Sequence, residues 1–264
     1  MTQEQMLLRA LPELPPEHLY VYPSLPSTND LARKLAASGA AHGTAVLADT
    51  QTAGRGRTGR TFVSPPGCGI YLSLILRPEA TAAELLHLTA VLAVAACDAV
   101  EEVTGFRPGV KWINDLVANG KKVGGILTEL AFSGPRPDFA VAGIGLNCNT
   151  APTAFPPELR RTAGSLAEMT GFPVDRTALA AALIRRWTQV ARTAVPERAK
   201  WMQRYRQDCV TPGQEVELIR DGTREQAFAL RVEDDGALLV RLSDGTQKRV
   251  FCGEASVRGK NGYL

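Results

Sequence analysis

A seven-residue run of glycine and arginine, GRGRTGR at 54–60, is followed closely by the proline pair Pro65 and Pro66. Its glycines match the G-x-G-x-x-G fingerprint of dinucleotide-binding folds, in which a strand precedes the motif and a helix opens at the third glycine. Residues 44–51 are suited to a strand, but the two prolines block a helix after the loop. No Gly-Lys-Ser/Thr follows, as a P-loop requires. The glycine spacing therefore matches the dinucleotide-binding fingerprint, but the residues that follow exclude a dinucleotide-binding fold.

Hydrophobic periodicity predicts an α+β fold built on one mixed, mostly antiparallel sheet. The predicted strands are 44–51, 69–78, 109–115, 121–130 and 138–149, with a hairpin turn at Asn119-Gly120. The predicted helices are 28–38, a long one from Thr81 to Gly105 with Thr81 and Glu84 as its capping box, and later ones at 164–170, 176–194 and 197–207. Residues 150–161 are proline-rich and predict an irregular loop.

The predicted secondary structure changes at Thr211, from long helices to short strands. From there short strands are separated by Asp-Gly turns, a spacing that predicts a small β-barrel of about five strands. The predicted organisation is a catalytic domain at 1–210 and a small C-terminal β domain at 211–264.

Composition limits the function classes. The formal net charge of +3 is too small to imply nucleic acid or a membrane surface, so any basic function must be local. Five scattered cysteines without C-x-x-C spacing favour reduced thiols in a cytoplasm over disulfides or zinc. The N-terminus lacks the apolar run of a signal peptide, and the stretch 85–97 is shorter than the ~20 residues of a membrane span. We expect a cytoplasmic protein with a buried core helix.

The arginine loop suits an anionic ligand. Arg55, Arg57 and Arg60 offer planar forks that match carboxylate or phosphate, and the glycines allow close backbone approach. A solvated hairpin tip and a nucleic-acid contact remain alternatives. The position between two strands, with three arginines and no acid in the loop, favours a ligand loop.

A second polar group lies at 111–129 and includes Lys111, Asn114, Asp115 and Lys122. On a continuous strand Lys111 and Trp112 would face opposite sides of the sheet, with Trp112 in the core and Lys111 in a cleft. Taken alone, Lys122 reads as a lysine protecting a hairpin edge. Paired glycines inside strands, at 124–125 and again at 143 and 145, indicate close approach of a ligand or another backbone.

These motifs together resemble the biotin protein ligases (biotin–[acetyl-CoA-carboxylase] ligases). The matching motifs are S-T-N at 27–29, Q-x-x-G-R-G-R-x-G-R at 51–60, S-P-P-G at 64–67, K-W-x-N-D at 111–115, K-x-x-G-I-L-x-E at 122–129 and G-I-G-L-N at 143–147. They occur in the family's order over about residues 24–258. Two positions depart from the family pattern: Ile113 replaces a proline and Phe62 replaces a tryptophan. Neither departure removes a charged group.

The resemblance implies an activity: joining biotin to ATP as biotinyl-5′-AMP, then acyl transfer to a lysine of a biotin carboxyl carrier protein. It implies a class II synthetase-like catalytic fold and an SH3-like C-terminal barrel. Biotin contacts are implied for Ser27, Thr28, Asn29, Gln51, Arg55, Gly56, Arg57, Lys122, Gly125 and Gly143. ATP contacts are implied for Arg57, Arg60, Lys111, Asn114, Lys122 and Asn147. Mg²⁺ is expected with ATP near Asn114 and Asn147.

The catalytic group implied by the resemblance is Lys111, Arg57, Lys122 and Asp115. For Asp115 two roles stay open, orienting Lys111 or helping the incoming lysine amine lose its proton. Orientation is favoured, because a carboxylate among cations is a weak base. The arginine loop and the proline-containing segment after Asn149 are candidates for a loop that closes over the adenylate.

Three other functions compete with this one. A lipoate or octanoate ligase or transferase shares the catalytic scaffold, and the arginine loop and C-terminal β domain favour biotin over it. An RNA-binding hairpin protein would release no pyrophosphate from biotin and ATP. Some family members are also repressors with an N-terminal winged helix-turn-helix, but only 26 proline-containing residues precede Ser27, so we expect no specific DNA binding. Relatives commonly form homodimers, which leaves a homodimer possible for this chain.

Overall fold

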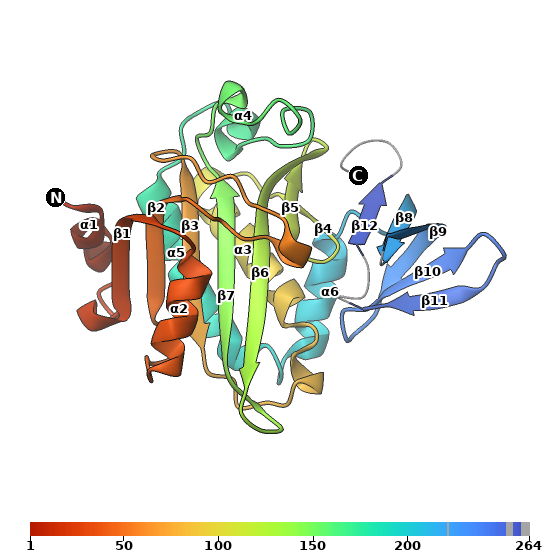
Figure 1. Cartoon of the computed structure of the whole chain (residues 1–264), viewed down its shortest axis with the longest axis horizontal. Helices are drawn as coiled ribbons and strands as arrows, with labels where there is room; N and C mark the ends of the chain where they lie inside the picture. Colours follow the sequence, from red (N-terminus) through yellow and green to blue (C-terminus); the bar gives the residue numbers. More distant parts are fainter. Residues whose placement is uncertain (221, 252–255, 260–264) are drawn as a thin grey trace.

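The computed structural model describes residues 1–220, 222–251 and 256–259 (Figure 1). A seven-stranded sheet has the order β1-β2-β3-β7-β6-β5-β4. Its strands are β1 (Leu19–Leu25), β2 (Ala45–Gln51), β3 (Gly69–Leu76), β4 (Gly109–Lys111), β5 (Asp115–Ala118), β6 (Lys121–Phe132) and β7 (Pro137–Asn147). β1 pairs with β2 in parallel, and the other neighbours pair antiparallel. The predicted mixed, mostly antiparallel sheet is confirmed.

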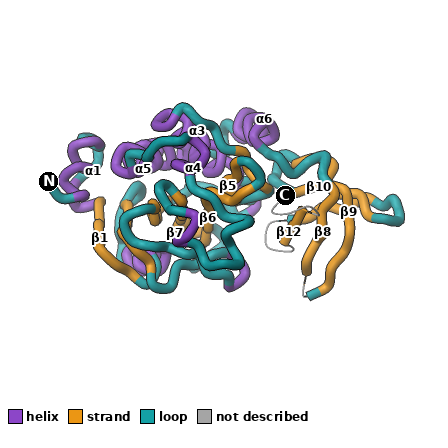
Figure 2. The backbone as a smooth tube through the Cα atoms, turned by 90° about the horizontal axis from the view of Figure 1, so that it is seen from above, coloured by secondary structure: helices purple, strands orange, loops and turns teal. Residues whose placement is uncertain are grey.

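Helices cover both faces of this sheet (Figure 2). They are α1 (Gln3–Ala10), α2 (Thr28–Ala37), α3 (Leu88–Thr104), α4 (Leu166–Thr170), α5 (Arg176–Thr193) and α6 (Arg198–Asp208). α3 and α5 pack together behind the sheet, and α2 packs on the opposite face against β2, β3 and β7. The arginine loop joins β2 to β3, and a long loop at 148–165 follows the upper end of β7 (Figure 1).

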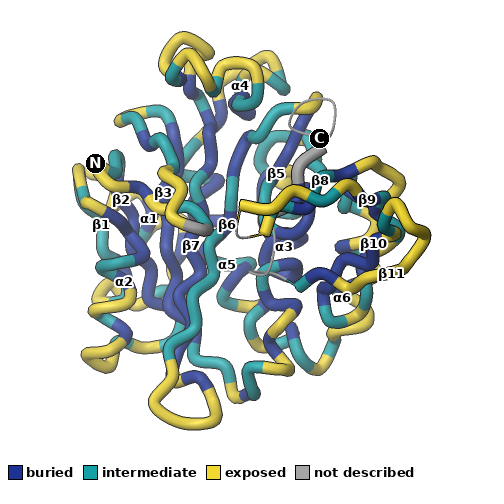
Figure 3. The backbone as a smooth tube through the Cα atoms, turned by 45° about the vertical axis from the view of Figure 1, so that its right-hand side comes forward, coloured by how far each residue is buried: buried dark blue, intermediate teal, exposed yellow. Residues whose placement is uncertain are grey.

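α3 is largely apolar over its first ten residues and carries acids only toward its C-terminal end, and 11 of its 17 residues are buried. A helix with this pattern is enclosed by its neighbours. The segment Ala83–Thr104 is the one stretch of the described residues that passes a length and hydropathy test for a membrane span, and most of it lies buried inside the fold. The predicted buried core helix is confirmed (Figure 3).

The start of this helix differs from the prediction. Thr81 and Glu84 do exchange the hydrogen bonds of a capping box. They cap a 3₁₀ turn at Ala83–Leu85, however, and α3 itself begins at Leu88. Gly105 ends the helix with a left-handed φ of 69°, as predicted.

The predicted strand at 109–115 is wrong in its middle. β4 ends at Lys111, residues 112–114 form a turn, and β5 begins at Asp115, so that Lys111 lies opposite Asp115 across the pair. Trp112 therefore does not alternate with Lys111 on a strand. The turn at Asn119-Gly120 has both φ angles positive, 49° and 72°, as the sequence predicted.

Two N-terminal elements were not predicted, α1 and β1. Thr2 and Gln5 form a capping box at the start of α1, and Leu7 and Leu11 are buried. α1 packs on α5, and β1 forms the edge of the main sheet. Residues 1–26 therefore belong to the same fold as the S-T-N segment.

The C-terminal region forms a second, five-stranded antiparallel sheet beside α6 and β4 (Figure 1). Its strands are β8 (Glu215–Arg220), β9 (Thr223–Val232), β10 (Leu238–Leu242), β11 (Gln247–Val250) and β12 (Ser256–Gly259), in the order β11-β10-β9-β8-β12. The predicted short strands are confirmed. An SH3-like closure and a domain boundary at 210/211 stay predictions. Asp221 of one predicted turn and Cys252 lie outside the described residues.

Candidate functional site

The arginine loop and the β4–β6 region meet at one cavity of about 440 Å³. The predicted residues that line it are Gly56, Arg57, Arg60, Lys111, Asn114, Asp115, Lys122 and Asn147. Arg57 and Arg60 also line a hollow of about 550 Å³ between the arginine loop, β6 and the start of α3. That hollow is not lined by Lys111 or Lys122, so the 440 Å³ cavity is the candidate active site.

A chain of side-chain contacts joins the two halves of this cavity. The Nη1 of Arg57 donates to Oδ1 of Asn114 at 2.9 Å. The Nδ2 of Asn114 donates to the carbonyl of Ile126 at 2.9 Å and to Oδ1 of Asp115 at 3.3 Å. The Nζ of Lys122 donates to the same Asp115 oxygen at 2.6 Å. Arg57 and Lys122, 65 positions apart in the sequence, therefore share one hydrogen-bonded chain.

Lys111 is buried, with 5% of its surface exposed, and it lines the cavity at the end of β4. Burying an ammonium group is costly unless a counter-charge or polar partners are present. Asp115 lies opposite Lys111 in the strand register, and it also forms an ion pair with Lys122 at 2.6 Å. The predicted orientation of Lys111 by Asp115 remains a prediction, and Asp115 is also placed to hold Lys122.

The S-T-N segment begins α2 beside a much smaller cavity of about 30 Å³. Ser27 caps the helix by accepting from the backbone N–H of Asp30 at 3.4 Å. Thr28 donates from its backbone N–H to Oε1 of Gln51 at 2.9 Å. The side chains of Ser27, Thr28, Asn29, Gln51 and Arg55 all line this slot.

Ser73 is a site residue that the sequence analysis missed. It is fully buried on β3, and its Oγ lies 2.8 Å from Oγ1 of Thr28 and 2.6 Å from Oδ1 of Asn29. Its hydroxyl therefore holds the side chains of Thr28 and Asn29 in place. A single polar residue in the otherwise apolar run GIYLSLIL was the signal that could have found it.

Arg55 is held by acids from outside the arginine loop. Its guanidinium contacts Asp30 on α2 at 2.6 Å and Glu129 on β6 at 2.7 Å. Burial acts to lower the pKa of Arg55, but the hydrogen bonds and charges of Glu129 and Asp30 outweigh it and raise that pKa. The loop has no acid of its own, yet the fold supplies two. Arg55 therefore anchors the loop, and its contact with biotin stays a prediction.

Three glycines make room for side chains of the site. A Cβ added at Gly143 would lie 2.0 Å from Oδ1 of Asn29, and one at Gly125 would lie 2.9 Å from Nζ of Lys122. At Gly145 it would lie 2.5 Å from the ring of Phe62. The ring of Phe62 lines both the small slot and the large cavity. Phe62 therefore forms the wall between them, with Nζ of Lys122 6.0 Å from its centroid.

The loop after β7 closes the far side of the large cavity. Its lining residues there are Phe155, Leu159, Thr162 and Ala163, none of which the sequence analysis singled out. Lys122 and the loop exchange backbone hydrogen bonds, from Lys122 N–H to Thr162 at 2.7 Å and from Gly164 N–H to Lys122 at 2.9 Å. Asn147 also donates from Nδ2 to the carbonyl of Gly164 at 3.0 Å. Val257 of β12 adds a contribution from the C-terminal sheet.

Among the described residues, no group of three or more His, Cys, Asp or Glu side chains could hold a metal ion. The large cavity offers instead the amide oxygens of Asn114 and Asn147. The Asn114 oxygen already accepts from Arg57. These donors fit a hard cation that arrives with phosphate and water ligands better than a resident metal.

The chain is similar in sequence to known biotin ligases. Residues 21–147 match the model of the biotin/lipoate A/B protein ligase family. The bifunctional ligase/repressor BirA of Bacillus subtilis is 35% identical over 240 residues, covering 88% of this chain and 72% of its own length. The biotin–[acetyl-CoA-carboxylase] ligase of Paracoccus denitrificans is 37% identical over 230 residues, covering 84% of this chain and 93% of its own length.

Solved structures agree. The biotin protein ligase of Aquifex aeolicus in complex with biotin and ATP has a TM-score of 0.78 at 30% identity, over 92% of this chain and 99% of that one. The fold and the site thus define a ligase of the biotin/lipoate class. The chain belongs to the biotin protein ligase family.

Proposed function

We propose that this enzyme joins biotin to ATP, forming biotinyl-5′-AMP and pyrophosphate, and then transfers the biotinyl group to a lysine of a carrier protein. The observation that carries the proposal is the convergence of Arg57, Lys111 and Lys122 on one cavity beside the S-T-N slot. The named relatives and the solved structures are biotin ligases, and they do not favour the lipoate or octanoate alternative.

The first step brings two anions together. A carboxylate oxygen of biotin attacks the α-phosphorus of ATP, and the bond to the pyrophosphate oxygen breaks. Fixed cations stabilise the charge that develops on the phosphoryl oxygens, and their effect is larger in a cavity that excludes water. Lys111 stabilises the phosphoryl group, while Arg57 and Lys122 hold the carboxylate and the adenylate oxygens.

The two cavities divide the substrates. Hydroxyl and amide groups of Ser27, Thr28, Asn29 and Gln51 complement the N–H donors and carbonyl of a ureido ring in the small slot. The large cavity takes the nucleotide, with Arg60, Asn114 and Asn147 on its wall. Lys122 and Phe62 lie where the two meet, which is where a carboxylate on biotin's tail would reach the phosphate.

The small slot does not hold biotin at its present volume of about 30 Å³. Phe62 fills part of the space above Gly145, and Arg55 closes the side. We propose that the Phe62 ring shifts when biotin binds, and that the arginine loop then orders over the adenylate and excludes water. The loop at 150–164 forms the opposite wall.

In the second step the lysine amine of the carrier attacks the acyl carbon and AMP leaves. The amine must lose a proton, and solvent or the phosphate can accept it while Asp115 holds Lys122. We assign Asp115 to positioning, in line with its 2.6 Å contact to Lys122. Mg²⁺ would enter with the ATP phosphates and neutralise their charge. Asn147 would be the preferred amide oxygen donor, since the Asn114 oxygen accepts from Arg57.

We further propose the carrier domain of a carboxylase as the partner, in agreement with the names of the relatives. A cytoplasmic location agrees with the four free cysteines among the described residues.

Pyrophosphate release tests the proposal. Purified protein with ATP and Mg²⁺ should release pyrophosphate only when biotin is added, and lipoate or octanoate should not replace biotin. Addition of a biotin carboxyl carrier domain should then yield a product heavier by one biotinyl group by mass spectrometry. Release that is independent of biotin, or dependent on lipoate, would overturn the proposal.

A further inference from the structure

β4 is the last strand of the main sheet, and only one of its sides pairs with a strand of that sheet. Its other side is covered by residues 208–211, the segment that leads from α6 to the C-terminal sheet. The N–H of Val210 donates to the carbonyl of Val110 at 2.9 Å, and Cys209 pairs with Val110 in parallel. Gly109 allows this approach, because a Cβ there would lie 2.7 Å from Cγ1 of Val210. β4 is three residues long, so this segment supplies one of its two flanking partners.

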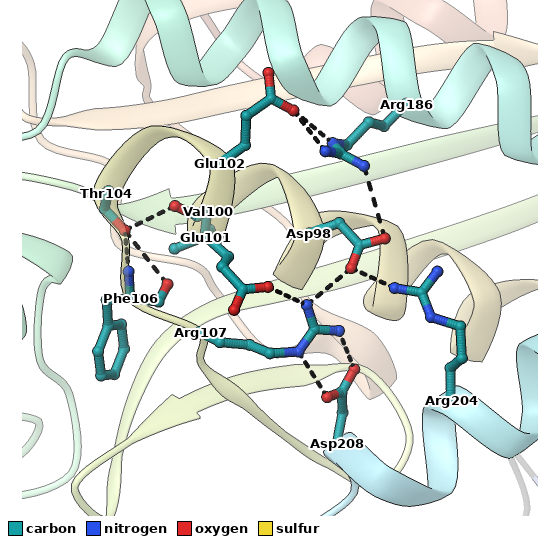
Figure 4. Close-up of polar contacts among 10 residues, drawn as sticks. All are labelled: Asp98, Val100, Glu101, Glu102, Thr104, Phe106, Arg107, Arg186, Arg204 and Asp208. Carbon is teal, nitrogen blue, oxygen red and sulfur yellow. Dashed lines mark hydrogen bonds and ion pairs between the residues drawn. The ribbon is translucent and has the colours of Figure 1, made fainter.

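An ion-pair network fixes the start of this segment (Figure 4). Arg107, two residues before β4, contacts Asp208 at 2.6 Å through Nη2 and Asp98 at 2.8 Å through Nη1. Arg204 contacts the same Asp98 at 2.5 Å. Hydrogen bonds to Asp208 raise the pKa of Arg107, so it stays charged throughout the working pH range. The segment is therefore held to α3 and α6 at its N-terminal end.

Trp112 makes two further contacts to the C-terminal part of the chain. Its backbone N–H donates to Oγ1 of Thr211 at 2.8 Å. Its indole Nε1 donates to the carbonyl of Gly236, in the turn between β9 and β10, at 2.9 Å. Both Trp112 and Thr211 are buried. Buried hydrogen bonds of this kind are costly to break, because the group left behind has no water to replace its partner.

The residue directly before Trp112 is Lys111, and the large cavity is lined by both of them and by Val257 of the C-terminal sheet. We infer that Trp112 is a positioning residue, through which the C-terminal sheet sets the place of Lys111 in the nucleotide half of the cavity. The inference rests on the proposed adenylation. It gives the C-terminal sheet a part in the first half-reaction, before any carrier protein binds.

Trp112→Phe tests this, because it removes the indole N–H and keeps most of the ring. We expect kcat/KM for ATP in biotin-dependent pyrophosphate release to fall about tenfold, while the Kd for biotin changes less than twofold. Thr211→Val should give the same pattern with a smaller loss, on the order of threefold. This second variant keeps the test valid if Trp112→Phe does not fold.

Trp187→Phe is the matched control. Trp187 is fully buried on α5 and donates from Nε1 to the carbonyl of Leu92 at 3.0 Å, away from the cavity. The Trp187→Phe variant should lower the Tm by about as much as Trp112→Phe does. It should leave kcat/KM for ATP within twofold of the wild-type value. If Trp112→Phe and Thr211→Val match this control in ATP kinetics, or weaken biotin and ATP equally, the positioning role is wrong. A wild-type protein that releases no pyrophosphate with biotin and ATP would remove the proposed function itself.

Discussion

At the scale of single residues, the site depends on which acid or amide holds each cation. Arg55 is engaged by Asp30 and Glu129, so it fixes the loop. Arg57 donates to the amide oxygen of Asn114 at 2.9 Å and lines the large cavity. Its guanidinium therefore lies where an anionic ligand in that cavity could contact it. Two arginines two positions apart thus have different tasks.

Lys111→Ala should separate chemistry from biotin binding. Lys111 lines the large cavity and is not among the residues that line the S-T-N slot, so its loss removes charge stabilisation at the phosphoryl group and leaves that slot intact. We expect the adenylation rate to fall by about 10²–10³-fold, the usual effect of losing one such group. The biotin Kd by calorimetry should change less than about threefold. Equal losses in both measurements would contradict this division.

Arg57→Ala should release the intermediate. Without the guanidinium, the loop loses its contact to Asn114 and its hold on the adenylate. We expect free biotinyl-5′-AMP to appear on the order of tenfold faster, the equivalent of one charge-assisted hydrogen bond. Chromatography of a single turnover measures it, with Arg33→Ala as the control for loss of an exposed arginine. Retention equal to wild type would show that Arg57 does not hold the adenylate.

Sequence motifs identified the charged residues that line the cavity, through their resemblance to the biotin protein ligases. They could not identify the partners of those residues. Three contacts each require residues from separate elements to meet: Ser73 with Thr28, Glu129 with Arg55, and Lys122 with Asp115. Strand spacing in a chain does not determine which side chains face each other across a sheet.

At the scale of elements, the hairpin of β4 and β5 matters most. The sequence predicted one strand at 109–115, since VKWI is apolar and β-branched enough for it. The structure breaks it after Lys111, where contacts to Thr211 and Gly236 hold Trp112 in a turn. These partners lie about a hundred residues away, so local propensity could not reveal them. The core elements α2, α5 and α6 were predicted within a few residues because their caps and apolar faces are local.

His87, which precedes α3, should make stability depend on pH. It is buried, and its Nε2 lies 2.7 Å from the carbonyl of Ala194. Burial lowers the pKa of His87 below 6.5, the hydrogen bond to Ala194 opposes this, and the charge of Arg198 adds to the lowering. Below pH 6.5 the unfolded state therefore binds more protons than the folded state, and the free energy of unfolding falls.

The expected measurement is a lower Tm at pH 5.5 than at pH 7.5, with a smaller difference in His87→Gln. Part of the difference should remain in that variant, because burial also lowers the pKa of His42. A variant whose Tm has the wild-type pH dependence would rule out His87 as a contributor.

At the scale of the whole molecule, two sheets share one site. The C-terminal sheet lies beside α6 and β4, contributes Val257 to the cavity and accepts the indole hydrogen bond of Trp112 (Figure 1). Sequence texture was enough to predict a separate β region after residue 210. It gave no sign that this region touches the nucleotide half, because Gly236 and Val257 are ordinary residues for a turn and a strand.

The first 26 residues contribute α1 and β1 to the catalytic fold. A relative named as a bifunctional ligase/repressor is matched over 72% of its length, so the comparison does not extend to the whole of it. We predict that this 264-residue chain does not bind DNA with sequence specificity. A mobility-shift assay with the DNA upstream of its own gene and a scrambled competitor checks this. A band competed only by the specific DNA would prove the prediction wrong.

The central claim is that Arg57 and Lys122, from two separate hairpins, act on the same reaction. A double-mutant cycle tests it most directly, by measuring biotin-dependent pyrophosphate release for Arg57→Met, Lys122→Met and the double variant. Because Arg57, Asn114, Asp115 and Lys122 form one hydrogen-bonded chain, the two losses should be non-additive by about 1 kcal/mol or more. Strictly additive losses, or either variant retaining the wild-type rate, would mean that the two cations do not act on the same reactants.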